Sequence, residues 1–269
     1  MKKNILRVTV IVLMVLVMNV ISNATIVTSG LVSHWTFDEG SGSAAVDSAG
    51  SNAGVITGTT SYITDTAGIG SSYSLNFTKS LGSYVAVADD ASLNTSSRTV
   101  GAWIKVGTPT GYDARYIVTK VGAGTGGWML WNNRDWNDDR VNYAHWGNFD
   151  LSGVDVPYVL DLHTTWHYVV VTYDWNAGTS TGTAKIYIDG IVKGTGTGTN
   201  TGITSYGLYI GGSEGSAGFN GLIDEVTYYN RALSQAEIQQ NYDAMFIPEP
   251  CTLVLLGAGL VSLIHRKTR

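Results

Sequence analysis

The sequence predicts an all-β domain, a sandwich or a barrel, followed by one short helix near its C-terminal end. Short apolar or aromatic runs alternate along the chain with turns made of Gly, Ser, Thr and Asn. Glycine contributes 33 of the 269 residues, charged residues make up only 14%, and 8 Trp and 15 Tyr supply large side chains for a core. Many short strands separated by turn signals are typical of these two architectures.

The expected strands follow one another along the middle of the chain. In residues 183–188 every second side chain is aliphatic, as in a strand with one buried face. Asp189-Gly190 then supplies a two-residue hairpin turn that needs positive φ angles. Residues 166–173 are apolar on both faces, which predicts a central strand covered on both sides. The expected strands are 31–37, 83–87, 99–106, 116–121, 128–131, 141–146, 166–173, 183–188, 191–193, 208–210 and 222–229.

One helix is expected after the last strand. Ser234 and Glu237 have the spacing of a capping box, in which each side chain bonds the backbone N–H of the other. Leu233 and Ile238 flank this box as a hydrophobic staple. The helix is expected to run to about Ala244 and to close the domain.

Composition excludes several classes of protein. The single Cys251 cannot form a disulfide within the chain. Six of the sixteen cations lie in the two terminal segments, so the central part carries 10 cations and 20 anions. Such an acidic surface repels nucleic acid and anionic lipid. No nucleotide loop, haem ligand or flavin motif occurs, so we expect no organic cofactor.

Residues 1–24 have the pattern of a secretory signal peptide. Three basic residues precede an apolar stretch at 8–21, and Ser22-Asn23-Ala24 supplies the small residues of a cleavage site. The apolar stretch is shorter than the roughly 20 residues of a spanning helix. We therefore expect an exported protein, the alternative being an uncleaved membrane anchor.

Residues 247–269 form a second targeting segment. Pro248-Glu249-Pro250 precedes a short apolar run at 253–264 and a basic tail, which stays on the cytoplasmic side. This arrangement resembles the PEP-CTERM sorting signal of Gram-negative bacteria. The resemblance implies an exosortase-type protease as partner, transient anchoring in the inner membrane by the terminal helix, and delivery to the cell surface or extracellular matrix. The alternative is a plain C-terminal membrane tail.

Eight segments of the middle part carry a further resemblance in their order along the chain. They resemble the LamG-like jelly-roll domains of the concanavalin A-like lectin/glucanase superfamily, over residues 30 to 244. The resemblance implies a two-sheet antiparallel jelly-roll β-sandwich with one short C-terminal capping helix, in a single domain at 25–246. The segments are 30–42 (GLVSHWTFDEGSG), 47–54 (DSAGSNAG), 100–105 (VGAWIK), 166–174 (WHYVVVTYD), 185–190 (KIYIDG), 208–212 (LYIGG), 219–226 (FNGLIDEV) and 230–234 (NRALS).

The superfamily that these segments resemble contains both enzymes and binding modules, so the site residues must decide. Retaining glucanases of this fold present two carboxylates roughly 5 Å apart, often as Glu-x-Asp-x-Glu or Glu-x-Asp-x-x-Glu on one strand. The four Glu of the middle part are not spaced in this way, and Asp224 and Glu225 are neighbours expected on opposite faces of a strand. No zinc spacing or G-x-S-x-G elbow occurs. We expect no enzyme; the alternative is a divergent polysaccharide-degrading enzyme.

LamG-like domains often bind a calcium ion, which takes six to eight oxygen ligands. The positions that resemble such a site are Asp38, Asp47, Asn52 and Asp224. We expect a structural calcium there. The alternative is that Asp38, Asp47 and Asn52 are turn formers that bond their own backbone.

Aromatic residues gather between positions 128 and 149. Trp136 lies in a polar loop, where burial is least expected, and Asp138, Asp139 and Arg140 beside it are expected to hydrogen-bond a ligand. Sugar sites combine an aromatic face with polar groups that fix orientation. The other tryptophans of this stretch are expected in the core: Trp128, Trp131 and Trp146.

Together these features predict an exported, surface- or matrix-sorted module that is not an enzyme. Its expected partner is a carbohydrate or another extracellular ligand, and it meets a membrane only through the terminal sorting helix. The alternative is a structural or adhesive matrix protein without glycan specificity.

Overall fold

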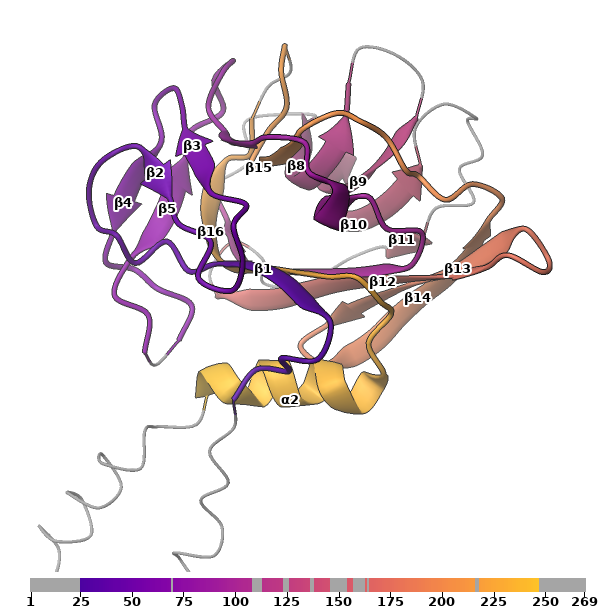
Figure 1. Ribbon diagram of the computed structural model, residues 1–269. Helices are drawn as coiled ribbons and strands as arrows, with labels where there is room; N and C mark the ends of the chain where they lie inside the picture. The colour runs from indigo at the N-terminus through magenta and orange to yellow at the C-terminus, as the bar shows by residue number, and fades with distance from the viewer. Residues whose placement is uncertain are drawn as a thin grey trace, which may run out of the picture.

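The computed structural model confirms the all-β prediction: two antiparallel sheets face each other, and helix α2 (Gln235–Phe246) lies against one of them (Figure 1). The structure describes residues 25–68, 70–107, 113–122, 126–135, 138–145, 154–156, 163, 165–215 and 218–246. The predicted signal peptide and sorting segment lie outside these residues. Within them, no helix has the length and apolar character needed to cross a membrane.

Sheet A has the strand order β14-β13-β12-β7-β16-β5-β4, with β1 paired to β16. Neighbours that are distant in the sequence, such as β7 and β16, show the crossovers of a jelly roll. The strands are β1 (Leu31–Trp35), β4 (Ser61–Ile63), β5 (Ser74–Phe77), β7 (Arg98–Val106), β12 (His167–Asn176), β13 (Thr181–Ile188), β14 (Ile191–Gly198) and β16 (Gly221–Tyr229).

Sheet B has the strand order β11-β10-β9-β8-β15-β6-β3-β2 and lies opposite sheet A (Figure 1). A short 3-10 helix, η1 (Ala91–Leu93), follows β6. The strands are β2 (Ala44–Ala45), β3 (Gly54–Ile56), β6 (Val85–Val87), β8 (Asp113–Val121), β9 (Gly127–Asp135), β10 (Asp138–His145), β11 (Val154–Val156) and β15 (Leu208–Ile210).

The central core fills the space between the sheets and contains fully buried large side chains such as Trp35 and Phe77. Strand β12 is covered on both sides, as predicted. Val169 and Val171 face the central core, whereas Tyr168 and Val170 belong to a second core on the outer face of sheet A. This alternation gives one strand two buried faces.

The second core lies between sheet A and α2. The ring of Trp103 stacks on Tyr168 and Tyr242, with centroids 5.3 and 5.6 Å apart. The capping box forms as predicted: the Ser234 N–H donates to Glu237 Oε2 at 2.8 Å, and the Glu237 N–H donates to Ser234 Oγ at 3.3 Å. Helix α2 therefore covers the outer face of sheet A.

The first described residues are tied to α2. The Val27 N–H donates to Asn241 Oδ1 at 2.8 Å, and Gln240 Nε2 donates to the Thr25 carbonyl at 2.8 Å. The Tyr229 hydroxyl donates to the Val27 carbonyl at 2.9 Å. We call this set of bonds the terminal clasp. It holds the two ends of residues 25–246 together beside α2 (Figure 1), and this segment contains both cores and every described strand.

The last glycine of β14, Gly198, has a packing cause. Gly198 on β14 and its partner Gly182 on β13 both face the ring of Tyr173, and a Cβ atom on Gly182 would overlap that ring. The Tyr173 hydroxyl donates to the Asn200 carbonyl at 2.6 Å, which fixes the ring. Glycine is therefore needed on the inward face of this edge. The preceding hairpin turn uses Asp189 at φ 52° and Gly190 at φ 77°, as predicted.

A buried cation lies at the same end of the sandwich. The Arg98 guanidinium sits 5.4 Å from the ring centroid of Trp128 and 5.3 Å from that of Tyr173, and Nη1 donates to the Tyr143 hydroxyl at 3.1 Å. His145 packs edge-on against Tyr173, with centroids 4.5 Å apart. Burial, and then the charge of Arg98, lower the pKa of His145 to about 3. His145 is therefore neutral in the fold.

We expect His145 to weaken the fold in mild acid. In the unfolded chain its pKa returns to about 6.5, so below that pH the unfolded state binds a proton that the fold does not. The contribution of the neutral His145 to the free energy of unfolding is complete above pH 6.5, and it is lost as the pH falls toward 3. At pH 5 the loss is about 2 kcal/mol. Urea unfolding of wild type and His145→Gln at pH 7 and pH 5 measures it, and an equal pH dependence of the two proteins would contradict it.

Candidate functional site

The predicted metal residue Asp47 lies in a loop that it holds together. Its Oδ1 accepts the N–H groups of His34, Ala49 and Gly50 at 2.9–3.1 Å, and its Oδ2 accepts that of Asn52 at 2.9 Å. Burial by itself would raise the pKa of Asp47, but these backbone donors outweigh it and hold the pKa below its usual value. Four backbone donors thus use the lone pairs of this carboxylate.

Asn52 joins this loop to the central core. Its Nδ2 donates to Ser33 Oγ at 2.8 Å and to Ser92 Oγ at 3.1 Å, and its carbonyl accepts the indole N–H of Trp35 at 2.8 Å. These contacts of Asp47 and Asn52 are those of turn formers, which is the alternative that the sequence leaves open.

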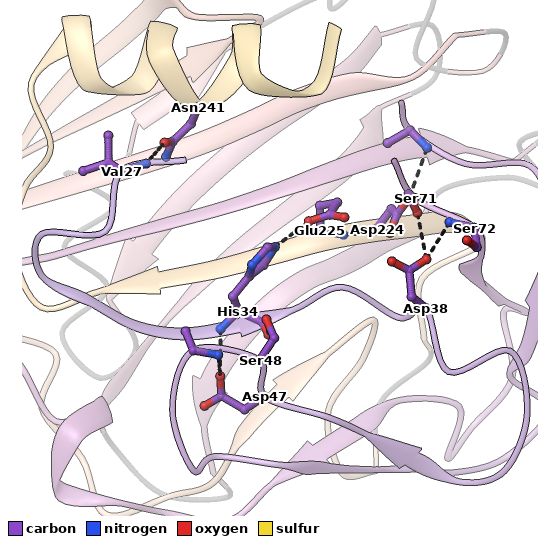
Figure 2. Close-up of polar contacts among 12 residues, drawn as sticks. Val27, His34, Asp38, Asp47, Ser48, Ser71, Ser72, Asp224, Glu225 and Asn241 are labelled. Carbon is purple, nitrogen blue, oxygen red and sulfur yellow. Dashed lines mark hydrogen bonds and ion pairs between the residues drawn. The ribbon is translucent and has the colours of Figure 1, made fainter. Parts of the chain in front are cut away.

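The other two predicted metal residues, Asp38 and Asp224, meet at Ser71 (Figure 2). The Ser71 hydroxyl lies 3.3 Å from Asp38 Oδ1 and 3.0 Å from Asp224 Oδ2. Asp38 also accepts the N–H of Ser72 at 2.6 Å and is exposed. Asp224 is fully buried and accepts the N–H of Ala67 at 3.1 Å. Burial, and then the charge of Glu225, raise the pKa of Asp224 to about 8.

Asp224 and Glu225 do not point to opposite faces of β16, so that expectation was wrong. Glu225 has φ 50°, and the pairing of β16 with β7 shifts between Asp224 and Thr227. Such a β-bulge inserts a residue and breaks the alternation of faces. Because Ile223 and Val226 both belong to the central core, the two carboxylates between them share the other face of sheet A. Glu225 there contacts His34 Nε2 (Figure 2).

The four predicted metal residues therefore fall into two groups. All three carboxylates already accept backbone N–H groups, four on Asp47, two on Asp38 and two on Asp224. Asp38 and Asp224 fit in part, because they converge on one hydroxyl. Among the residues that the structure describes, no group of three or more His, Cys, Asp or Glu is placed to hold a metal ion.

The predicted ligand loop is the tip of the β9–β10 hairpin. Trp136 lies outside the described residues, as do the side chains of Asp138 and Asp139, although their backbones pair with Asp135 and Arg134. Arg140 is half-buried, and its carbonyl accepts Nδ2 of Asn132 at 2.9 Å.

Of the three tryptophans expected in the core, Trp128 is there and Trp131 is not. Trp128 is 1% exposed and packs against Tyr228 with ring centroids 6.3 Å apart. Trp131 lies three residues further along β9, so strand alternation turns it to the outer face of sheet B. It is half-buried there. Trp146 lies outside the described residues.

The outer face of sheet B carries a row of three side chains that sequence reasoning missed. Trp131 pairs with Tyr116 on β8 and with Asn142 on β10. Tyr116 is half-buried, and Asn142 is 8% exposed. Paired residues of antiparallel strands share a face, so these three side chains are neighbours. We call them the sheet B row.

The comparisons with known proteins agree with this architecture. A family model described as the concanavalin A-like lectin/glucanases superfamily matches residues 78–239. A search of curated protein sequences finds no match.

Several solved structures share the fold. Domain 4 of AbnA, a GH43 extracellular arabinanase from Geobacillus stearothermophilus in complex with arabinotriose, has a TM-score of 0.58 and 20% identity over 80% of this chain and 98% of that domain. The binding domain of botulinum neurotoxin DC in complex with SialylT has a TM-score of 0.59 and 15% identity over 81% of this chain and 52% of its own. Trypanosoma rangeli sialidase has a TM-score of 0.55 and 17% identity, over 81% of this chain and 33% of its own.

At these identities the likeness to solved structures concerns the fold, and this chain spans about half of the neurotoxin domain and a third of the sialidase. The family model, in contrast, matches more than half of the 269 residues. The chain therefore belongs to the concanavalin A-like lectin/glucanases superfamily.

Proposed function

We propose that this protein is an exported carbohydrate-binding module without catalytic activity. The observation that carries the proposal is the outer face of sheet B, where the half-buried aromatic rings Tyr116 and Trp131 stand beside the buried amide of Asn142. Sugar sites combine aromatic faces with a few oriented polar groups. The arabinanase domain that matches over 98% of its length is described in complex with arabinotriose, which supports a saccharide as ligand.

The contacts of three of the four described glutamates support a non-catalytic role. Glu39 accepts the Val46 N–H and the Tyr62 hydroxyl, Glu225 contacts His34, and Glu237 caps α2. Each of these carboxylates therefore holds a loop, a strand or a helix end. A retaining glycosidase needs two carboxylates about 5 Å apart that both face a sugar ring.

Saccharide binding is measured with the protein comprising residues 25–246. We expect isothermal titration calorimetry to detect binding to at least one of soluble arabinan, xylan and mixed-linkage β-glucan. We expect no release of reducing ends from any of them, because Glu39, Glu225 and Glu237 are engaged in structural contacts. Reducing ends released at a rate that scales with protein concentration would contradict the non-catalytic role. Absence of binding across the panel, with surface deposition retained, would favour an adhesive matrix protein.

Calcium is proposed only for Asp38 and Asp224, which would supply carboxylate oxygens beside the Ser71 hydroxyl. A bound cation would supply the positive charge that the buried Asp224 lacks. We expect the melting temperature to be several degrees higher in calcium than in chelator, because a ligand that binds only the fold stabilises it by mass action. Asp224→Asn should remove the difference. Equal melting of wild type in calcium and in chelator would contradict calcium binding at the concentration tested.

We also propose export through residues 1–24 and sorting through residues 247–269. The support is the sequence pattern of each segment, with Pro248-Glu249-Pro250 as the motif read by an exosortase-type protease in the inner membrane of a Gram-negative bacterium. Replacing these three residues by alanine should leave an unprocessed protein in the membrane fraction. Identical processing of variant and wild type would contradict the role of the motif.

A further inference from the structure

We propose that the protein forms an intramolecular isopeptide bond between the amine of Lys120 and the carboxamide of Asn94, with Asp89 transferring the protons. Lys120 Nζ lies 2.7 Å from Asp89 Oδ1, and Asn94 Nδ2 donates to the same oxygen at 3.0 Å. One carboxylate oxygen therefore contacts both the nitrogen that attacks and the nitrogen that leaves. This inference is independent of the proposed carbohydrate binding.

The fold brings these three residues together from two separate elements. Asp89 precedes the N-cap residue of η1, and Asn94 is its C-cap residue. Lys120 lies on β8 and pairs with Trp128 of the central core, so its side chain enters the sandwich from that strand. The bond would join η1 to sheet B. In a chain with a single cysteine, it would supply the covalent tie that disulfides give many secreted domains.

Burial favours the neutral, nucleophilic form of the Lys120 amine. The side chain is 1% exposed, and burial lowers its pKa, which the contact with Asp89 restores only in part. Nζ also donates to the carbonyls of Thr204, at 3.1 Å, and of Tyr206. A neutral amine has two N–H groups for these two carbonyls, which leaves its lone pair on the side of Asp89.

The position of the Asp89 carboxylate suits the proton transfers of the reaction. Asp89 Oδ1 takes a proton from the Lys120 ammonium, and the free Nζ attacks Cγ of Asn94. The bond between Cγ and Nζ forms, and the bond between Cγ and Nδ2 breaks. Nζ gives up two protons in all, and Nδ2 leaves with them as ammonium, so no oxidant or co-reactant is needed. A general acid and base must lie within hydrogen-bond reach of the groups it serves, as Asp89 does here.

The carboxamide of Asn94 is held away from water. Its Oδ1 is buried and has no hydrogen-bond partner among the residues that the structure describes. A buried acceptor without a partner is costly, so the unmodified amide is in an unfavourable position. Water, which would compete with the amine as nucleophile, does not reach this oxygen. The arrangement therefore favours attack by Lys120 over hydrolysis.

A second lysine shows what distinguishes Lys120. Lys105 Nζ lies 2.8 Å from Asp65 Oδ2, so the contact between the two side chains is alike. The other donor to Asp65 is the indole N–H of Trp166, which an amine cannot attack to form an amide. The Lys105 side chain is also 26% exposed. Lys105 therefore has the acid but lacks both the burial and the carboxamide.

Intact-mass spectrometry of the protein comprising residues 25–246 tests the bond. We expect wild type to be lighter than its sequence by one molecule of ammonia, and a digest to contain a cross-linked peptide pair with Lys120 and Asn94. The variants Lys120→Arg, Asn94→Ala and Asp89→Ala should each have the full mass of their sequence. Lys105→Arg is the matched control and should keep the loss of ammonia. Melting curves check that each variant folds.

Two outcomes would overturn the inference. Wild type that keeps its full sequence mass after prolonged incubation at neutral and alkaline pH contains no isopeptide bond. A succinimide at Asn94 also loses ammonia, but it gives no cross-linked pair and persists in Lys120→Arg. Loss of ammonia with a cross-linked pair in Asp89→Ala would overturn the role of Asp89 in proton transfer. The proposed carbohydrate binding stands or falls separately, because none of these measurements involves a glycan.

Discussion

Asp47→Ala is expected to destabilise the fold by about 4 kcal/mol, because one carboxylate accepts four backbone N–H groups. Each bond to a charged acceptor contributes about 1.5–3 kcal/mol, and part of the loss is recovered when water solvates the loop. The loss should be equal in calcium and in chelator, since the backbone, rather than an ion, occupies the oxygens. Urea unfolding in the two buffers measures it.

Acid provides an independent check of the same carboxylate. The pKa of Asp47 is lower in the fold than in the unfolded chain, where it is about 3.9. The ionised carboxylate therefore stabilises the fold fully above pH 3.9, and this stabilisation is lost as the pH falls through the pKa of the folded state. Asp90→Ala is the control, because Asp90 is an exposed cap whose carboxylate accepts the Ser92 N–H. It should cost less than Asp47→Ala. A loss at Asp47 as small as this one would contradict our account of the loop.

Gly182→Ala is expected to cost about 3 kcal/mol, because its new Cβ atom would overlap the buried ring of Tyr173. That ring has little room to move: its hydroxyl is bonded to the Asn200 carbonyl, and one face lies against the Arg98 guanidinium. Thermal or urea unfolding of the variant measures the loss. Gly178→Ala, in the exposed hairpin turn between β12 and β13, is the control and should cost below about 1 kcal/mol.

A double-mutant cycle separates overlap from loss of backbone freedom. In a Tyr173→Leu background the space beside Gly182 is larger, so adding Gly182→Ala should cost less than about 1 kcal/mol. Equal costs of Gly182→Ala in both backgrounds would mean that the ring does not dictate glycine at this position.

The sequence predicted every strand longer than four residues and missed five of the shorter ones. All eleven expected strands are present, and each carries at least two apolar or aromatic residues. Strands β2, β3, β4, β5 and β11 have two to four residues each. Each is too short to show an alternating pattern by itself. The capping box and the Asp189-Gly190 turn were predictable because their signals are local.

The candidate site was less predictable, since it depends on which face each residue takes. Trp131 was expected in the core because tryptophan side chains are usually buried. Its spacing of three residues from Trp128, however, already places the two side chains on opposite faces of one strand. The shared face of Asp224 and Glu225 could not be foreseen, because no Gly marks the bulge at Glu225. The bonds of Asp47 depend on the approach of β1, which supplies the His34 N–H from thirteen residues away.

The terminal clasp would set the orientation of the domain in a chain tethered, as proposed, through residues 247–269. Both ends of residues 25–246 leave the fold beside α2, and the outer face of sheet B lies on the opposite side of the sandwich (Figure 1). A protein tethered through its C-terminal segment therefore turns α2 toward the tether and the sheet B row toward the medium. The proposed tether and the outer face of sheet B would then lie at opposite ends of the domain, so attachment would leave that face uncovered.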